Sequence, residues 1–311
     1  MTPAEMEDLR QQHYNATLAE VKRANPDLAI FRIRPDFVIP EHKPGQYSTL
    51  GLGQWEARVE GCQPEKSLDN PDAEKRLVRR AYSLSCSILD SDGGLIDLSE
   101  ANFVEIYVVL VREAADAPPA LTPRLFMLEK GSRLFLGEKI TGRFTAQSVR
   151  AGDTVLFLST GTGEAPHNYM LWELLQRGHE GPILAACCVR YRQDLGYLAV
   201  HEELMRRYPN YTYLPLTTRE PANAGHKVYI QDLLAGGQIE ERLGKALDPV
   251  STQVFLCGNP AMIGVPEVDR ATGEASFPQP RGVIEILAER GFKVESPATR
   301  GQGNIHFEEY W

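Results

Sequence analysis

The first half of the chain consists of short apolar segments rich in β-branched and aromatic residues, each followed by a turn. Glycine and proline mark the turns, as in Lys43-Pro44-Gly45 and Asp92-Gly93-Gly94, because both residues favour the backbone angles of tight turns. Several short strands without a long helical stretch are typical of an antiparallel barrel. The predicted strands are Ala29–Ile33, Phe37–Pro40, Gln46–Leu52, Tyr82–Ser87, Val104–Val111 and Arg133–Leu136.

After Gly152-Asp153 the pattern changes, and apolar strands alternate with helical stretches. The first stretch, His167–Arg177, has Met170, Leu171 and Leu174 on one face, which is the spacing of a helix packed on a sheet. Such alternation builds βαβ units around a doubly wound parallel sheet, whose ligands bind at the carboxyl ends of the strands. The other predicted elements are the strands Thr154–Ser159, Ile183–Val189, Tyr211–Leu216 and Gln253–Cys257 and the helices Leu195–Tyr208 and Tyr229–Leu243.

The change of pattern predicts two domains. The length of 311 residues, about twice that of an average domain, agrees with this division. We place the boundary near residues 148–152. Residues 1–150 are then an antiparallel β-barrel domain, and residues 151–311 are an α/β domain with an aromatic C-terminal tail. The polar stretch Cys62–Arg79 is expected to be a surface loop or a short helix, without an assigned role.

Charge and hydropathy exclude several classes of protein. A net charge of −9 argues against a nucleic-acid partner, because phosphates require a basic surface. No apolar run of this chain approaches the about 20 residues that a membrane helix needs. The segment Met1–Arg10 carries acidic residues where a signal peptide would carry a basic and then an apolar stretch. We therefore expect a cytoplasmic protein without membrane contact.

The five cysteines lack the spacing of a disulfide framework, a zinc site or an iron–sulfur cluster. Cys187 and Cys188 are adjacent, whereas Cys62, Cys86 and Cys257 stand apart. An iron–sulfur cluster needs about four thiolates at set spacings, and disulfide frameworks use even numbers of cysteines. We expect reduced thiols and no bound metal.

A glycine-rich turn, Thr160–Pro166, follows a predicted strand directly and precedes a predicted helix. Gly161 and Gly163 let the backbone approach a pyrophosphate closely, because a Cβ at these positions would collide. Pro166 suits the first helical turn, and the helix N-terminus supplies free amide donors. The turn departs from the Gly-x-Gly-x-x-Gly pattern of ordinary dinucleotide folds. Glycine also occurs in strand-to-helix turns that bind nothing, so the motif alone leaves both interpretations open.

This turn resembles the Gly-Thr-Gly-x-Ala-Pro loop of the ferredoxin–NADP reductase superfamily, in which Thr162 and Gly163 would contact the nucleotide. A second segment, Arg80-Ala81-Tyr82-Ser83, is similar to the Arg-x-Tyr-Ser motif of the same superfamily. Pro44-Gly45-Gln46-Tyr47 before it and Leu121–Leu125 after it match further family segments at the family's spacing. The resemblance implies FAD in the first domain and NADP(H) in the second.

By this resemblance, the second motif holds the flavin. Arg80 would form a bidentate contact with the FAD pyrophosphate, and Tyr82 would stack on the isoalloxazine ring. Ser83 would hydrogen-bond the flavin nitrogen that accepts hydride. Without the flanking matches, the alternative is a half-buried strand whose polar residues face solvent. The other residues expected at FAD are Ala81, Tyr107, Val109 and Val111 and, at its pyrophosphate, Leu121, Thr122, Pro123 and Arg124.

The resemblance also implies a preference for NADPH over NADH. Selecting NADPH requires cations and hydroxyls around the 2′-phosphate, where an NAD site places a carboxylate. Thr217–Glu220 ends the third predicted strand of the second domain, and Lys227–Gln231 is similar to the plant-type segment that holds the phosphate and covers the adenine. Each charge is also compatible with ordinary solvent-exposed surface. The expected residues are Arg190, Thr218, Arg219, Lys227, Tyr229 and Gln231.

The nicotinamide is expected where the last predicted strand ends. Cys257–Met262 matches the family's Cys-Gly-x-x-x-Met segment, in which Gly258 allows the nicotinamide to pass closely and Cys257 lines its pocket. We also expect Met262 to contact the cofactor. The alternative for Cys257 is a buried structural cysteine. The segment Val265–Gly282 that follows looks like an insertion relative to short bacterial members, and we assign it no role.

The chain ends on Glu308-Glu309-Tyr310-Trp311. By the resemblance, Tyr310 covers the flavin where the nicotinamide must land, Glu308 is the accompanying acid, and Trp311 contacts the FAD adenine. A tail that packs into a groove of the core is the alternative. The expected catalytic residues are Ser83, Cys257, Glu308 and Tyr310.

The resemblance thus implies an FAD-containing NADPH oxidoreductase that exchanges single electrons with ferredoxin or flavodoxin. Those partners are acidic, and the basic residues Lys75, Arg76, Arg79 and Arg80 lie beside the flavin motif, where a local basic surface would steer association. The alternatives are an NADPH-dependent flavin, quinone or ferric reductase of the same superfamily and an electron-relay subunit of a larger complex. We expect a monomer.

Overall fold

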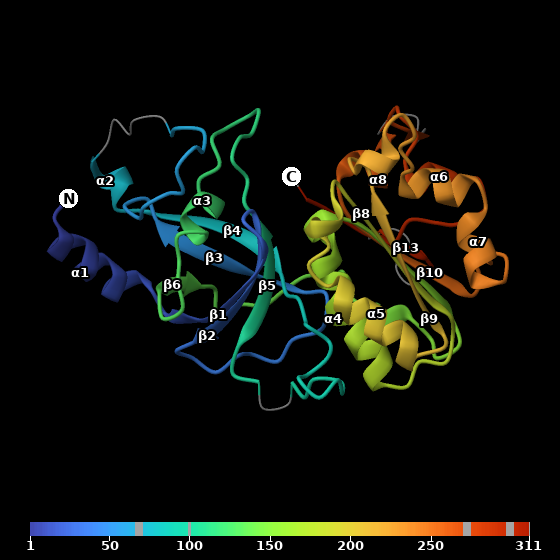
Figure 1. Ribbon diagram of the computed structural model, residues 1–311, viewed down its shortest axis with the longest axis horizontal. Coiled ribbons are helices and arrows are strands. Elements are labelled where there is room, and N and C mark those ends of the chain that lie inside the picture. Colours follow the sequence, from blue (N-terminus) through green and yellow to red (C-terminus); the bar gives the residue numbers. More distant parts are fainter. Residues whose placement is uncertain (66–70, 99–100, 270–274, 297–301, 311) are drawn as a thin grey trace. The chain divides into compact units, whose positions relative to one another are not determined.

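A computed structural model describes residues 1–65, 71–98, 101–269, 275–296 and 302–310 (Figure 1). Contacts divide the chain into two compact units. Unit 1 comprises Met1–Cys86 and Asp97–Arg143, and unit 2 comprises Ser87–Ile96 and Phe144–Trp311. Each unit contains its own large sheet.

Unit 1 is built on a six-stranded antiparallel sheet in the order β4-β3-β6-β1-β2-β5. Leu18, Ile33 and Leu50 are fully buried in its interior. Its strands are β1 (Ala16–Asn25), β2 (Leu28–Pro35), β3 (Tyr47–Gly53), β4 (Leu77–Ser83), β5 (Val104–Val109) and β6 (Arg133–Leu136), and its helices are α1 (Pro3–His13), α2 (Pro71–Glu74) and α3 (Thr122–Leu125).

Helix α1 precedes the sheet and buries none of its side chains. The side chain of Thr2 accepts from the backbone N–H of Glu5, whose carboxylate accepts from the N–H of Thr2, and such a reciprocal box stabilises a helix start. Arg10 then forms a two-point ion pair with Glu56, at 2.9 and 2.7 Å, which fastens the helix to the turn after β3. The hydropathy pattern did not predict α1, because this helix has no apolar stripe.

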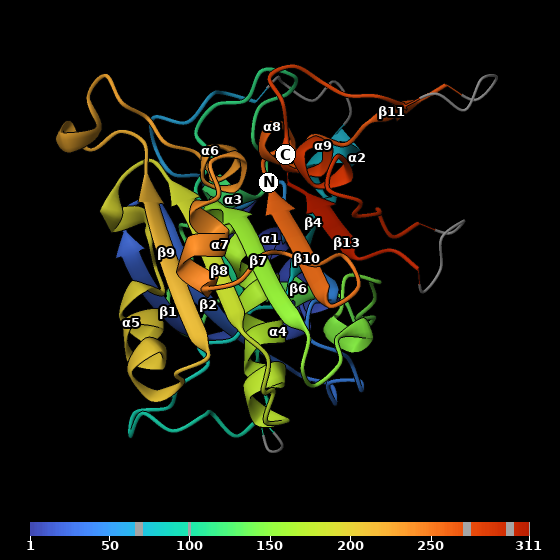
Figure 2. The same ribbon diagram turned by 90° about the vertical axis from the view of Figure 1, so that its right-hand side faces the viewer.

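Unit 2 is built on a five-stranded parallel sheet in the order β13-β10-β7-β8-β9, which Figure 2 shows strand by strand. The strands are β7 (Thr154–Thr160), β8 (Ile183–Val189), β9 (Tyr211–Thr217), β10 (Thr252–Gly258) and β13 (Ile305–Glu309). The helices are α4 (Glu164–Gln176), α5 (Leu198–Arg207), α6 (Ile230–Ala235), α7 (Gln238–Leu243), α8 (Pro260–Ile263) and α9 (Val283–Ala288). Short 3-10 turns lie at Ala146–Ser148, Gly161–Gly163, Arg192–Asp194 and Pro221–Asn223.

Helices cover both faces of this parallel sheet (Figure 1). Alternate residues of β7 point to opposite faces, because side chains alternate along a strand. Val155 and Phe157 pack in the cluster that contains α4 and α5, whereas Leu156 and Leu158 pack in the cluster that contains α6 to α9. The predicted fold class, an antiparallel barrel-like domain followed by an α/β domain with a parallel sheet, is confirmed.

Several predicted elements were wrong in detail. Phe37–Pro40 forms no strand, since β2 ends at Pro35 and a proline offers no N–H to a neighbouring strand. The predicted helix Tyr229–Leu243 is two helices, α6 and α7, separated by Gly236-Gly237, of which Gly237 has a left-handed φ of 78°. The C-terminal tail is a fifth parallel strand, β13, paired with β10.

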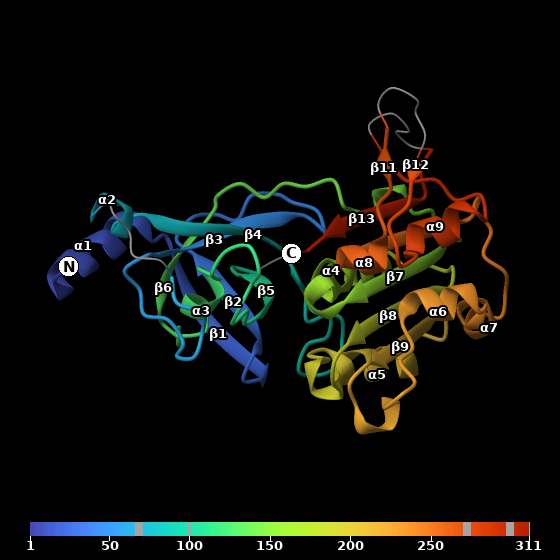
Figure 3. The same cartoon turned by 90° about the horizontal axis from the view of Figure 1, so that it is seen from above.

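The described residues of the two segments without an assigned role form short elements. The stretch 62–79 contains α2 and the first residues of β4. Within 265–282, β11 (Glu267–Val268) and β12 (Ala275–Ser276) form a two-stranded antiparallel ribbon (Figure 3). In the described part of the chain, no helix is long and apolar enough to cross a membrane. The same residues contain no group of three or more His, Cys, Asp or Glu side chains that could hold a metal ion.

Candidate functional site

The glycine-rich turn connects β7 to α4 at the carboxyl edge of the parallel sheet in unit 2. Gly161 has a left-handed φ of 54°, and a Cβ at this position would meet open space. Gly163 is buried, and a Cβ there would stand 2.3 Å from the backbone oxygen of Cys257. The turn therefore lies directly on the end of β10, while its Gly161 side stays open to a ligand. Thr162 lies between them, half-buried.

Three of the predicted phosphate-site residues lie together at the ends of β8 and β9. The backbone N–H of Thr218 donates to the carbonyl oxygen of Val189 at 3.0 Å, and that of Arg219 donates to the carbonyl oxygen of Arg190 at 2.8 Å. Arg190 and Arg219 are exposed, and Thr218 is partly exposed. The structure thus brings two guanidinium groups and a hydroxyl to the same edge of the sheet as the glycine-rich turn.

The other three predicted phosphate-site residues surround the start of α6. Tyr229 caps this helix with its backbone and is 43% exposed. Lys227 is exposed. Gln231 donates to the carbonyl oxygen of Ala261 at 3.4 Å, which links α6 to the segment that follows β10.

The predicted nicotinamide residues meet at the ends of β10 and β13. The strand register pairs Cys257 with Glu308, and the N–H of Tyr310 donates to the carbonyl oxygen of Gly258 at 2.8 Å. Gly258 has a φ of 125°, and a Cβ there would lie 2.2 Å from the hydroxyl of Thr160. This close approach requires glycine, because the Thr160 hydroxyl accepts the N–H of the residue after Gly258 at 2.7 Å.

The thiol of Cys257 is fully buried. Burial, together with the nearby Glu308 carboxylate, raises its pKa well above the ordinary value, while a hydrogen bond with Tyr310 opposes the shift. A protonated thiol is a poor nucleophile, so the environment suits a pocket wall rather than covalent chemistry. Met262 is a residue of α8 and is buried in the core on that side of the sheet. Trp311 lies outside the described residues.

The predicted flavin motif lies on β4 of unit 1. The register pairs Ser83 with Tyr47 and Tyr82 with Ser48, so the Arg-x-Tyr-Ser motif adjoins the Pro-Gly-Gln-Tyr turn. Arg80 and Ala81 are exposed, Tyr82 is half-buried and Ser83 is buried. The structure therefore brings two motifs far apart in the sequence into adjacent strands, with an exposed guanidinium beside a partly exposed aromatic ring.

The residues expected along FAD on β5 differ in exposure. Tyr107 is buried and Val109 is 42% exposed. Val111 follows the strand, and its N–H donates to the hydroxyl oxygen of Thr122 at 3.1 Å. Because that oxygen acts as an acceptor, the hydroxyl hydrogen of Thr122 can still be donated to another group. Leu121 and Pro123, on either side of Thr122, are buried.

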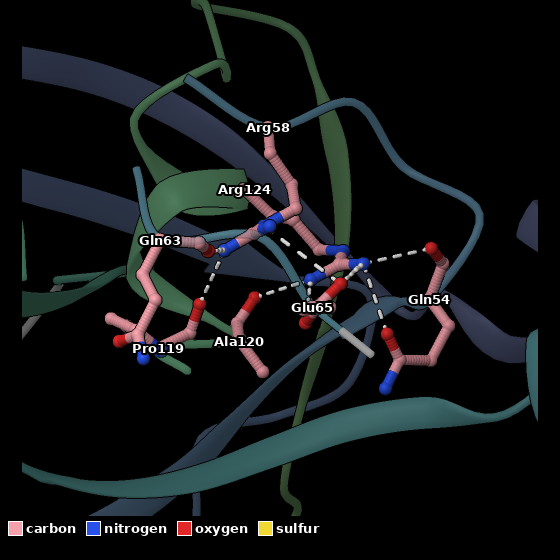
Figure 4. A network of polar contacts seen from close by, with 7 residues as sticks. All are labelled: Gln54, Arg58, Gln63, Glu65, Pro119, Ala120 and Arg124. Carbon is pink, nitrogen blue, oxygen red and sulfur yellow. Dashed lines mark hydrogen bonds and ion pairs between the residues drawn. The ribbon is translucent and has the colours of Figure 1, made fainter. Parts of the chain in front are cut away.

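Arg124, expected at the FAD pyrophosphate, is instead buried among protein acceptors (Figure 4). Its terminal nitrogens donate to both carboxylate oxygens of Glu65, to the carbonyl oxygen of Ala120, and to the carbonyl and amide oxygens of Gln54. Arg58 lies next to this group and donates to two backbone carbonyl oxygens, those of Gln63 and Pro119. Arg124 thus fastens residues 54–65 to the start of α3.

Comparisons with known proteins agree with this geometry. Residues 157–267 match the family described as the oxidoreductase NAD-binding domain. The flavodoxin/ferredoxin–NADP reductase of Buchnera aphidicola is 25% identical over 250 residues, which are 80% of this chain and 86% of that protein. The protein of the same name from Escherichia coli is 28% identical over 191 residues, or 60% and 69% of the two chains. The chain is thus similar to flavodoxin/ferredoxin–NADP reductases over most of its length, and residues 157–267 match an oxidoreductase NAD-binding domain.

A solved member of the ferredoxin–NADP reductases has the same fold. The enzyme from Neisseria gonorrhoeae, with bound FAD and NADP, aligns with a TM-score of 0.66 over 96% of this chain and 98% of that chain. Sequence identity in this alignment is 22%.

One polar group at this site was missed by the sequence analysis. Glu164, in the variable position of the Gly-Thr-Gly-x-Ala-Pro loop, is buried, hydrogen-bonded to Tyr213 and within ion-pair distance of His201. The sequence around a glutamate at a loop-to-helix junction does not indicate that its carboxylate is buried. The groups it contacts lie on α5 and β9, far away in the sequence, so the contacts are seen only in the folded chain.

Proposed function

We propose that the chain is an FAD-containing NADPH oxidoreductase that exchanges electrons with ferredoxin or flavodoxin, as a cytoplasmic monomer. The observation that carries this proposal is the shared edge of the parallel sheet, where the open turn at Gly161 lies with Arg190 and Arg219. An open glycine turn suits a pyrophosphate. Two guanidinium groups suit a further phosphate, which NADPH has and NADH lacks.

Glu220 is the acidic residue next to the expected 2′-phosphate site, and its carboxylate is already hydrogen-bonded to the protein. Glu220 follows Arg219, and its carboxylate accepts the backbone N–H of Arg192 at 2.6 Å. An NAD-selective site would direct a carboxylate at the ribose hydroxyls. Thr218 and Lys227 add a hydroxyl and a cation to the expected phosphate contacts, and Tyr229 offers an accessible ring for the adenine. The arrangement favours NADPH.

Unit 1 offers the side chains that FAD requires. The exposed guanidinium of Arg80 and the hydroxyl hydrogen of Thr122 are donors for a pyrophosphate. The half-buried ring of Tyr82 suits stacking on a flavin, and Ser83 supplies a hydroxyl one residue further along β4. Val109 and Val111 offer apolar and backbone contacts. Arg124 would act indirectly, by fixing the loop and the helix start that carry Thr122.

Bound FAD would supply the redox chemistry, taking up a hydride from NADPH and releasing electrons singly. The residues of the chain would bind FAD and NADPH and orient them. Gly258 lets the end of β10 pass close to Thr160, and Cys257 would form an uncharged wall beside the nicotinamide. We assign Tyr310 the role of the aromatic side chain that the nicotinamide displaces, with Glu308 as the nearby acid.

Ferredoxin or flavodoxin is the proposed partner because both are acidic and unit 1 has an exposed basic group. Lys75, Arg76, Arg79 and Arg80 are all exposed on or just before β4. Arg79 lies over the ring of Phe135, with its guanidinium carbon 4.1 Å from the ring centroid, which limits its freedom. A basic surface beside the flavin residues would attract an acidic electron carrier.

A second candidate is a reductase that serves an oxygenase. The reductase component of a phenol 2-monooxygenase from Pseudomonas is 30% identical over 125 residues, which are 39% of this chain and 33% of that protein. A dedicated partner of that kind would replace a free ferredoxin or flavodoxin.

The proposal is tested by acceptor kinetics with the purified chain. Flavin released by denaturation identifies the cofactor, and NADPH-dependent reduction of ferredoxin, flavodoxin and free riboflavin is then compared at several salt concentrations. We expect FAD, and reduction of a carrier protein that slows steeply as salt rises. Reduction of riboflavin alone, without any effect of salt, would instead assign the chain to the free flavin reductases.

A further inference from the structure

Glu164 is a buried carboxylate at the glycine-rich turn. It directly follows Gly163, begins α4 and is 3% exposed. Its Oε1 accepts the hydroxyl of Tyr213 at 2.6 Å and lies 3.1 Å from Nε2 of His201. Burying a carboxylate is costly unless it is bonded to compensating groups. Tyr213 on β9 provides a hydrogen bond, and the imidazole of His201 on α5 lies within ion-pair distance.

Two tyrosines complete this group. Burial and the nearby Glu164 carboxylate raise the pKa of Tyr211 and Tyr213 well above the ordinary tyrosine value, so both phenols keep their hydrogens. The hydroxyl of Tyr211 is hydrogen-bonded to Nδ1 of His201 at 2.7 Å. Nε2 of His201 lies within ion-pair distance of Glu164 but outside hydrogen-bond geometry. The imidazole also stacks on Tyr213, with ring centroids 4.0 Å apart.

A residue of β8, Cys187, also contacts the glycine-rich turn. Cys187 is buried, and the Glu164 carboxylate contributes to raising the pKa of its thiol. The thiol lies 3.7 Å from the carbonyl oxygen of Gly161 and donates to it. The turn is therefore held at Gly161 by β8 and after Gly163 by β9 and α5.

The attachment to β9 connects the two halves of the nucleotide site. Tyr213 lies on β9, and the same strand continues to Thr217 and is followed by Thr218 and Arg219. A bond between Glu164 and Tyr213 thus fixes the turn, which would hold the pyrophosphate, relative to the residues that would hold the 2′-phosphate. NADPH spans both, so the distance between them affects its affinity.

We propose that Glu164, through Tyr213 and His201, is a positioning residue that sets the glycine-rich turn at the separation from the β9 end that a dinucleotide 2′-phosphate requires. This inference rests on the NADP(H) binding proposed above. It concerns a residue that touches no nucleotide itself.

The test compares two ligands in calorimetric titrations of the full-length protein as purified. NADP+ needs both the turn and the β9 end, whereas 2′-AMP needs only the β9 end. For Glu164→Gln and Tyr213→Phe, we expect about tenfold weaker binding of NADP+, equal to about 1.4 kcal/mol, and a change within about twofold for 2′-AMP. Glu164→Gln keeps the size of the side chain, and Tyr213→Phe removes one hydroxyl.

Asn210→Ala is the matched control. Asn210 lies at the opposite end of β9, where its amide donates to the carbonyl oxygens of His179 and Gly181 at 2.9 Å. This variant should lower thermal stability as the other two do, yet leave the ratio of the two dissociation constants unchanged. A purely structural role for Glu164 would give the same unchanged ratio in all three variants.

The outcomes separate the inference from the proposed function. If the wild-type protein binds neither ligand, NADP(H) binding itself is wrong. If it binds both, and the ratio is unchanged in Glu164→Gln and Tyr213→Phe, the positioning role is wrong. Tighter NADP+ binding by Glu164→Gln would also overturn the role, because it would mean that the carboxylate repels the phosphates.

Discussion

Arg124 and Glu65 form a two-point ion pair inside unit 1, with nitrogen–oxygen distances of 2.8 and 2.7 Å. Arg124 is 2% exposed at its side chain and Glu65 is 24% exposed. The pair joins the loop after β3 to the segment that begins α3, over 59 residues of sequence. A buried guanidinium needs such a partner, because an isolated charge would lose its solvation without compensation.

Replacing Glu65 with Gln should therefore destabilise the protein. Arg124 would remain buried without an anionic partner, and we expect the free energy of unfolding to fall by about 2–3 kcal/mol. Urea denaturation measures this change, and flavin retention on a desalting column should fall with it. Glu60→Gln, at an exposed position of the same loop, is the control and should unfold like the wild type. An unchanged urea midpoint for Glu65→Gln would show that the Arg124–Glu65 ion pair does not stabilise the protein.

Gly163 should not tolerate a methyl group. Its Cβ would stand 2.3 Å from the Cys257 backbone oxygen, and backbone cannot yield as a flexible side chain does. We expect Gly163→Ala to lower the free energy of unfolding by about 1–3 kcal/mol and to weaken NADP+ binding. Gly152→Ala, where a Cβ meets nothing within 4 Å, is the matched control. Equal thermal stability of the two variants would contradict the packing of the turn on β10.

Arg219 should distinguish NADPH from NADH. Its guanidinium is expected at the 2′-phosphate, and a charge-assisted hydrogen bond contributes about 1.5–3 kcal/mol. Arg219→Ala should raise the KM for NADPH by about tenfold to a hundredfold and leave that for NADH nearly unchanged. Steady-state kinetics with both nucleotides decide the matter, with the exposed Arg242→Ala as control. An equal loss with both nucleotides would mean that Arg219 does not contact the phosphate.

His167 should make unit 2 sensitive to acid. Its ring packs near Phe144 and Phe157, and burial lowers its pKa from 6.5 to about 3. Between those values the unfolded chain binds a proton and the folded chain does not. The free energy of unfolding therefore falls as pH drops, by about 1.4 kcal/mol per pH unit for this histidine.

The variant His167→Leu should show a shallower loss of stability than the wild type between about pH 6.5 and 4. His306, whose pKa burial lowers to about 4, would supply part of the remaining slope. Urea unfolding at several pH values gives the comparison, and the exposed His226→Gln should keep the wild-type slope. Identical slopes for His167→Leu and the wild type would show that His167 is not the source.

Elements with a buried, uniform apolar pattern were predicted well from the sequence. Strands β7, β8, β9 and β10 were all expected within two residues of their ends, and β7, β8 and β10 are buried nearly throughout because helices cover both faces of the sheet. The glycine-rich turn was also recognisable, since its position between a strand and a helix follows from the chain order alone.

Strand β13 was not predicted as a strand, because pairing with β10 determines it rather than its own pattern. Its sequence, Ile305-His306-Phe307-Glu308-Glu309, alternates poorly and ends on two acids. A hydropathy pattern does not reveal backbone hydrogen bonds to a strand that is far away in the sequence. Arg124 differed for a similar reason: a motif places it in the sequence, but Glu65 and Gln54 decide where its guanidinium points.

The central claim, an FAD enzyme that uses NADPH, is tested most directly by absorbance spectroscopy without oxygen. The purified chain is recorded between about 350 and 500 nm, where oxidised flavin absorbs, and NADPH or NADH is then added. The account predicts a yellow protein that NADPH bleaches rapidly and NADH bleaches slowly. A colourless chain that also fails to bind added FAD would contradict it.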